Sequence, residues 1–368
     1  MNFSPNWVSK PGNTILDILE ERGISMSQYA SSIDYSADYL EDIIEGVENI
    51  NFDIAETLAK SLGANANFWL QREKQYRKAL AKRVEKDKLE SWVSHLPVKE
   101  MKKLGWISGE KNNIDECLNF FNVKSFEGFN DKYSFDKNQL AFRKSPAFES
   151  KIGSVAAWFR RGEILTSSYR TKDWDKEKFI LELEEIKKLT RVKDISKFLP
   201  ELIDRCKRCG VKLAVVPTPK GCPVSGATKF IDEKTAIIVL SFRYLSDDQF
   251  WFTFFHEAGH LVMHGQNRTF LELKKGGITN EEEKEANLFA AEMLVPYNLH
   301  SELNQLRSNK RRIVKFAIKA GVSPGIVVGQ LQFLGIVRQD YLNGFKRRFN
   351  WEDIDDVIKN YHIKLESD

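Results

Sequence analysis

Apolar residues recur at helical spacing along most of the chain. Residues 12–62 contain five short helical patterns, residues 66–90 continue as one long basic helix, and residues 91–205 remain mostly helical. Within that middle stretch, Asp173–Leu189 has the pattern of an amphipathic charged helix. After Pro296 the chain is helical again, with a short turn at residues 320–324. The pattern predicts a fold that is α+β and mostly α.

Strand-like stretches are confined to one region. Val211–Pro217 and Thr235–Ser241 are rich in β-branched and apolar residues, and Val224–Phe230 alternates between them. The turn residues Asp232-Glu233-Lys234 separate the last two stretches. We therefore expect a small sheet directly before the next helix.

That next helix carries the most specific motif of the chain. Residues 256–260 read His-Glu-Ala-Gly-His, an HExxH motif inside an apolar run. Two histidines four positions apart lie on one face of a helix, so both imidazoles can bind one zinc ion. Glu257 follows the first histidine and can act as general base on a water that the metal activates. The weaker interpretation is two core histidines beside a surface glutamate.

The residues around the motif support a helix. Ser246 and Gln249 have the spacing of a capping box, with Ser246 as the N-cap. His264 and Gly265 mark the expected end, because glycine is the usual residue after a helix C-terminus. A second helix is expected to begin at Thr279 or Asn280. The three glutamates at 281–283 are then best interpreted as helix-start charges.

A catalytic zinc site needs a third protein ligand. Glu285 is the favoured candidate, because it shares a helical stripe with Phe289 and Met293 and should face the core. A carboxylate in that position needs a partner, which a metal would supply. Glu282 lies near the same stripe, and His264 follows His260 by four residues, so both stay as alternatives.

With these motifs in place, residues from about 180 to 340 resemble the ImmA/IrrE family of zinc metallopeptidases. The matching segments are Cys222–Thr228, Trp251–His260, Glu285–Asn287, Phe289–Ala291 and Leu294–Pro296. The resemblance implies His256, His260 and Glu285 as zinc ligands and Glu257 as general base. It also implies a protein substrate, a repressor of the helix-turn-helix type. For an oxyanion or outer-shell role the sequence offers Tyr244 and His264.

The N-terminal residues resemble another family. Ser25–Ala30 opens one helix, Ser36–Ile44 forms the next, and the region closes on Phe68-Trp69-Leu70. This arrangement is similar to the XRE type of helix-turn-helix, and most of all to its HigA antitoxin version. A helix-turn-helix of that type would place Tyr39 and Asn49 in reach of DNA or of a partner.

The charge of this segment departs from a DNA-binding pattern. No lysine or arginine occurs between Arg22 and Lys60, whereas that interval holds eight acidic residues. Phosphate neutralisation dominates affinity for DNA, and this surface has the wrong sign. We therefore expect a protein-binding or dimerising module, with DNA as the less favoured partner. The basic helix at residues 72–88 is expected to be a solvated face.

Length, charge and composition limit the number of domains, the class of partner and the cellular location that we expect. The 368 residues predict two or three domains, and the net charge of +4 is too small to indicate a nucleic-acid partner. No signal-peptide pattern and no apolar run of membrane-spanning length occurs, so we expect a cytoplasmic protein with no membrane partner. Cys206 and Cys209 form a CxxC, which is best interpreted as two helix residues before a glycine cap.

The expected organisation has four parts. They are a HigA-like helix-turn-helix domain at 1–80, a helical middle region at 81–180, an ImmA/IrrE-like zinc peptidase at 181–345 and a helical extension at 346–368. The favoured function is a zinc-dependent endopeptidase that cleaves a repressor or an antitoxin. The alternatives are a DNA-binding regulator or antitoxin with a sensory zinc domain, and a pseudo-enzyme with structural zinc.

Overall fold

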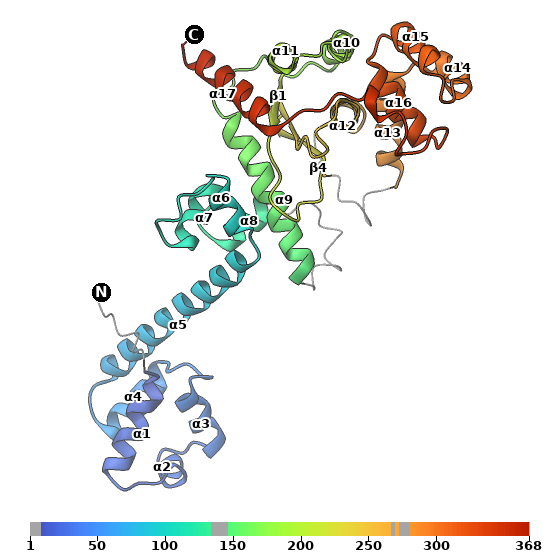
Figure 1. Cartoon of the computed structure of the whole chain (residues 1–368). Coiled ribbons are helices and arrows are strands. Elements are labelled where there is room, and N and C mark those ends of the chain that lie inside the picture. Colours follow the sequence, from blue (N-terminus) through green and yellow to red (C-terminus); the bar gives the residue numbers. More distant parts are fainter. Residues whose placement is uncertain (1–8, 134–145, 266–268, 272–279, 368) are drawn as a thin grey trace. The chain divides into compact units, whose positions relative to one another are not determined.

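The computed structural model describes residues 9–133, 146–265, 269–271 and 280–367. The chain forms two compact units, Met1–Ser91 and Trp92–Asp368 (Figure 1). The second unit contains the expected middle region from residue 92 onward, the peptidase region and the C-terminal extension. The three boundaries between the four expected parts remain predictions.

The first unit is a small helical bundle. Four short helices precede a long one, instead of the five short patterns expected: α1 (Pro11–Glu21), α2 (Met26–Ser32), α3 (Ala37–Glu45), α4 (Phe52–Leu62) and α5 (Ala66–Ser94). Ser25 caps α2 in a full capping box with Gln28, and Ser36 caps α3. Ile15, Leu40 and Trp69 are fully buried in its core. Local caps and one apolar cluster thus define this unit.

Helices also open the second unit. They are α6 (Val98–Lys103), α7 (Asn113–Phe121), α8 (Phe126–Tyr133), α9 (Pro146–Leu165), α10 (Lys176–Leu189) and α11 (Ile195–Lys207). Trp106, Trp158 and Phe159 are buried among these helices. Cys206 lies in α11, and Cys209 lies just before Gly210, which has a φ of +81°. Both thiols are free and buried, and burial raises the pKa of Cys209 to about 11.

The sheet has the three strands expected and a fourth short one. The strands are β1 (Val211–Val215), β2 (Gly226–Asp232), β3 (Thr235–Leu240) and β4 (Thr269–Leu271), in the order β1-β3-β2-β4. β1 pairs with β3 in parallel, whereas β2 is antiparallel to both of its neighbours. The β2–β3 hairpin turns at Asp232, whose carboxylate accepts a hydrogen bond from the Lys234 amide.

Helices cover both faces of the sheet. Ala236, Ile238 and Leu240 of β3 point into the core shared with α11 and with the long central helix α12 (Asp247–Met263). On the other face Val239 meets α9 so closely that a Cβ at Gly162 would lie 2.6 Å from it. β3 is therefore apolar without alternation, as a strand buried on both faces requires.

The central helix α12 begins and ends where expected. Ser246 is its N-cap residue, but its side chain makes no capping hydrogen bond, so the predicted capping box with Gln249 is wrong. The Ser246 hydroxyl donates instead to Asp248 at 2.7 Å. His264 is the C-cap, and Gly265 follows with a φ of +77°. The helix is apolar on nearly every side, which is why it lies inside the unit.

The remaining helices follow α12 along the chain. They are α13 (Asn280–Leu294), η2 (Tyr297–Leu299), α14 (His300–Gln305), α15 (Lys310–Ala320), α16 (Pro324–Phe333), η3 (Asn343–Phe345) and α17 (Trp351–Ser367). Both α13 and α16 pack against α12, and α17 packs against α11. Residues 345–349, here called the strap, run beside the start of α12. The Asp247 amide of α12 donates to the Arg347 carbonyl of the strap, and the Phe349 amide of the strap donates to the Leu245 carbonyl.

Across the described residues no single helix is long and apolar enough to cross a membrane; α15 and α16 reach that length and composition only together, and they are bent by 107°.

Candidate metal centre

Helices α12 and α13 bring three possible metal ligands together. The Nε2 atoms of His256 and His260 lie 3.1 Å apart on one face of α12. The Glu283 carboxylate of α13 lies 3.4 Å from each of these nitrogens, one oxygen facing each ring. Both histidines are buried, and a quarter of the Glu283 side chain is exposed. Two histidines and one carboxylate form the ligand set that catalytic zinc sites use.

The spacing of these atoms fits zinc. Zinc–nitrogen and zinc–oxygen bonds of about 2.0–2.1 Å in a tetrahedron place the ligand atoms roughly 3.3 Å apart. The two histidine nitrogens, 3.1 Å apart, are close to that value, and each lies 3.4 Å from a different oxygen of Glu283. One carboxylate oxygen and the two nitrogens all lie within 4.8 Å of one another, which is close enough to bind one ion. Three protein ligands leave the fourth tetrahedral position for water or substrate, which is the composition of a catalytic site.

The protonation states of His260 and Glu283 also favour metal binding. Burial lowers the pKa of His260, and this outweighs the opposite effect of Glu283. Burial alone would raise the pKa of Glu283, but its hydrogen bonds and charge interactions with His256 and His260 lower it to about 2. At neutral pH the carboxylate is therefore ionised and the His260 ring is neutral. Metal ligands need these two states.

Glu285, the expected third ligand, does not face the core. Its side chain is 53% exposed, and its carboxylate contacts His264 Nε2 at 2.9 Å. The prediction that Glu285 faces the core is therefore wrong, and Glu283, predicted only as a helix-start charge, faces the two histidines instead.

The buried face of α13 explains the difference. Ala286 and Ala290 are fully buried there, whereas Leu288 is 56% exposed. Small side chains let α13 approach α12 closely, and a Cβ at Gly259 would lie only 3.0 Å from Phe289. Glu283 lies three residues before Ala286 and seven before Ala290, so it shares their face. The alanine spacing was the feature that could have identified it.

Glu257 is buried against the first residue of β2. Its side chain is almost fully buried, and a Cβ at Gly226 would lie 2.5 Å from Glu257 Oε1. The same Cβ would lie 2.7 Å from Thr253. Glycine is thus needed where the strand meets the helix, and this contact fixes the position of the glutamate.

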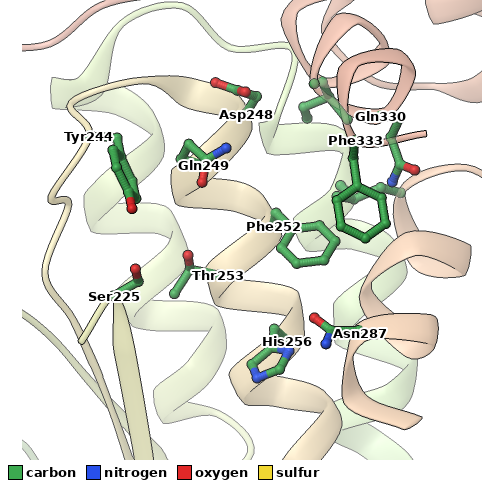
Figure 2. Close-up of a pocket in the computed structure, with 13 residues that line it drawn as sticks. Ser225, Tyr244, Asp248, Gln249, Phe252, Thr253, His256, Asn287, Gln330 and Phe333 are labelled. Carbon is green, nitrogen blue, oxygen red and sulfur yellow. The ribbon is translucent and has the colours of Figure 1, made fainter. Parts of the chain in front are cut away.

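A cleft of about 320 Å³ begins at His256 and runs along α12 (Figure 2). Phe252 lies between His256 and Phe333, with ring centroids 6.4 and 6.5 Å away. Phe333 of α16 is 77% exposed. The polar lining comprises Ser225, Tyr244, Asp248, Gln249, Thr253, Asn287 and Gln330. The cleft therefore combines an apolar strip with hydrogen-bonding groups, as ligand sites do.

The other candidate residues lie in different places. Tyr244 lines the cleft and is 44% exposed, whereas His264 lies outside the lining, between His260 and Glu285. In the first unit, Asn49 is exposed and Tyr39 is half-buried against the Tyr35 ring. Sequence reasoning missed Phe252, Asn287, Gln330 and Phe333 as cleft residues, because they are scattered over three helices.

Residues 217–331 match the family model described as the IrrE N-terminal-like domain, a peptidase family. The match supports the resemblance to the ImmA/IrrE family and identifies a metallopeptidase-like domain within the second unit. The matched residues include the three candidate metal ligands, Glu257 and the cleft-lining residues named above except Phe333. No curated protein matches the chain.

Proposed function

We propose that the chain is a zinc-dependent endopeptidase, with zinc held by His256, His260 and Glu283. The observation that carries this proposal is the buried ligand cluster at the end of a cleft, directly beside Glu257. When bound, zinc supplies Lewis acidity, which makes hydroxide available near neutral pH.

The chain's own residues divide the remaining work. The Glu257 carboxylate accepts a proton from the attacking water and then delivers it to the nitrogen of the leaving amine. The cleft orients an extended segment of the substrate, whose apolar side chain packs against the strip formed by Phe252 and Phe333. The burial of Glu257 against Gly226 keeps its carboxylate in one position.

Glu257→Gln tests the mechanism, because it keeps the size of the side chain and all three proposed ligands. We expect wild-type zinc content and a loss of cleavage on the order of 10²-fold or more. Cleavage is measured by mass spectrometry on a protein substrate, with zinc content measured on the same samples. Unchanged cleavage by this variant would contradict the role of Glu257.

The substrate we propose is a protein regulator of the repressor or antitoxin type, recognised by the first unit. Asp38, Glu41, Asp42 and Glu45 are all exposed on α3. An acidic helix of this kind suits a basic protein surface and repels DNA phosphates.

A salt series with duplex DNA and the full chain tests this choice of partner. We expect only non-specific binding, with Kd of roughly 10⁻⁴–10⁻⁶ M at physiological salt. Changing Glu41 and Asp42 to lysine should instead lower cleavage of the protein partner while zinc content stays the same. Nanomolar, sequence-specific DNA binding that depends on Tyr39 or Asn49 would restore the regulator as the better function.

A further inference from the structure

His260 is the start of a chain of polar contacts that leads away from the metal centre. Its Nδ1 lies 3.1 Å from Nδ1 of His264, and Nε2 of His264 lies 2.9 Å from the Glu285 carboxylate. The His264 side chain is 6% exposed, whereas Glu285 is 53% exposed. The contacts therefore connect a buried ligand to a carboxylate at the surface.

The two ends of this series of contacts, the metal centre and the Glu285 carboxylate, determine where the ring hydrogens lie. Nε2 of His260 faces His256 and Glu283, so its lone pair is the one available to a metal. The hydrogen of a neutral His260 ring then sits on Nδ1 and is donated to Nδ1 of His264. His264 must carry its own hydrogen on Nε2, where the Glu285 carboxylate accepts it. Each nitrogen has one role, and the series ends on a negative charge.

We infer that His264 and Glu285 are positioning residues of the metal centre, acting through Nδ1 of His260. Together they hold the imidazole in the tautomer that binds metal and increase the basicity of its Nε2. Glu285 therefore supports zinc binding without ligating it. The inference rests on the proposed zinc site, but it does not depend on the peptidase reaction.

The other histidine ligand lacks this support. Nδ1 of His256 is buried and makes no hydrogen bond with any described residue. The two ligands on α12 thus differ in their surroundings. Loss of the contacts through His264 and Glu285 should make the His260 ring less ordered and leave His256 and Glu283 in place.

The zinc affinity of the full-length protein tests this inference, measured by competition with a chelator. His264→Phe keeps a ring of similar size and should weaken zinc binding by about 10- to 100-fold. Glu285→Ala should weaken zinc binding by about 10-fold or less, because water can replace an exposed carboxylate. Glu285→Gln retains an oxygen acceptor and should recover part of the loss. Glu281→Ala removes an exposed carboxylate from the same helix and serves as the control.

The double variant His264→Phe/Glu285→Ala gives the sharpest result. If Glu285 acts only through His264, the double variant should bind zinc no more weakly than His264→Phe alone. The inference would be overturned if the losses of zinc-binding free energy in the two single variants added up in the double variant. It would also be overturned if neither single variant changed the zinc affinity. A loss in Glu285→Ala as large as that in Glu283→Ala would make Glu285 a direct ligand and also overturn it. Wild-type protein that fails to cleave while these zinc effects persist would refute the peptidase proposal alone.

Discussion

Two groups of buried carboxylates lie at opposite ends of α12, and their partners differ. At the start of the helix, Asp248 forms an ion pair with Lys346 Nζ at 2.7 Å. The neighbouring Asp247 accepts hydrogen bonds from the Ser323 hydroxyl at 2.8 Å and the Arg347 amide at 3.0 Å. Burial raises the pKa of Asp247. These groups are satisfied by the strap and by α16.

Near the other end, Glu283 faces two histidines instead of a lysine or arginine. A neutral imidazole such as that of His260 cannot compensate the negative charge of a partly buried carboxylate, whereas a divalent cation can. Carboxylates inside a protein therefore indicate a metal only when their described partners are residue types that can also bind the metal. Carboxylates such as Asp248, paired with a fixed cation, stabilise the fold instead.

Glycines make room for both groups. A Cβ at Gly226 would lie 2.5 Å from Glu257, and a Cβ at Gly325 would lie 2.7 Å from Asp247. Matched substitutions at the two ends of α12 can therefore separate a defect in chemistry from a defect in stability.

The largest effect is expected from Glu283→Gln, which removes the charged ligand and keeps the size of the side chain. Zinc affinity should fall by more than the roughly 100-fold that outer-shell changes reach. Chelator competition measures the affinity, with Glu281→Gln, an exposed glutamate of the same helix, as the matched control. A protein that binds zinc normally without Glu283 but loses it without Glu285 would reverse the assignment.

Lys346→Met should have the next largest effect, at the other end of the helix. Both partners of this ion pair are more than nine-tenths buried, and the change leaves the Asp248 charge uncompensated. Removal of one partner of a buried pair costs about 3–5 kcal/mol of unfolding free energy. Denaturant unfolding measures this loss, and the zinc content per folded chain should not change. A stable variant that lacks zinc would show that the two ends are not independent.

The smallest effects are expected from the two glycines. Gly226→Ala displaces the Glu257 carboxylate, and displacements of about 1 Å at a reacting group can lower kcat on the order of 10²-fold, with zinc retained. Gly325→Ala should lower the unfolding free energy by about 1–3 kcal/mol through overpacking and leave kcat unchanged. Equal losses of kcat in both variants would mean that Gly226 acts through general stability.

Local patterns in the sequence were sufficient for much of this structure. The three long strands, the β2–β3 turn, the extent of α12 and the glycine after it were predicted from residue types alone. These features depend on neighbours within a few positions, and the same holds for the two histidines that share one helical face. The predicted capping box does not form, because the Ser246 hydroxyl donates its hydrogen bond to Asp248, two residues away.

The sequence by itself determined that His256 and His260 lie together and that Glu257 follows between them, because helical periodicity fixes those relations. Only the tertiary structure decided which glutamate meets them. Glu283 and Glu285 differ by two residues, about 200° around a helix, so a choice between them depends on which face of α13 packs against α12. Ala286 and Ala290 are fully buried on that face, although large apolar residues gave the stronger pattern. The cleft wall at Phe333 and the strap at Lys346 also come from distant segments, whose meeting depends on packing rather than on local propensity.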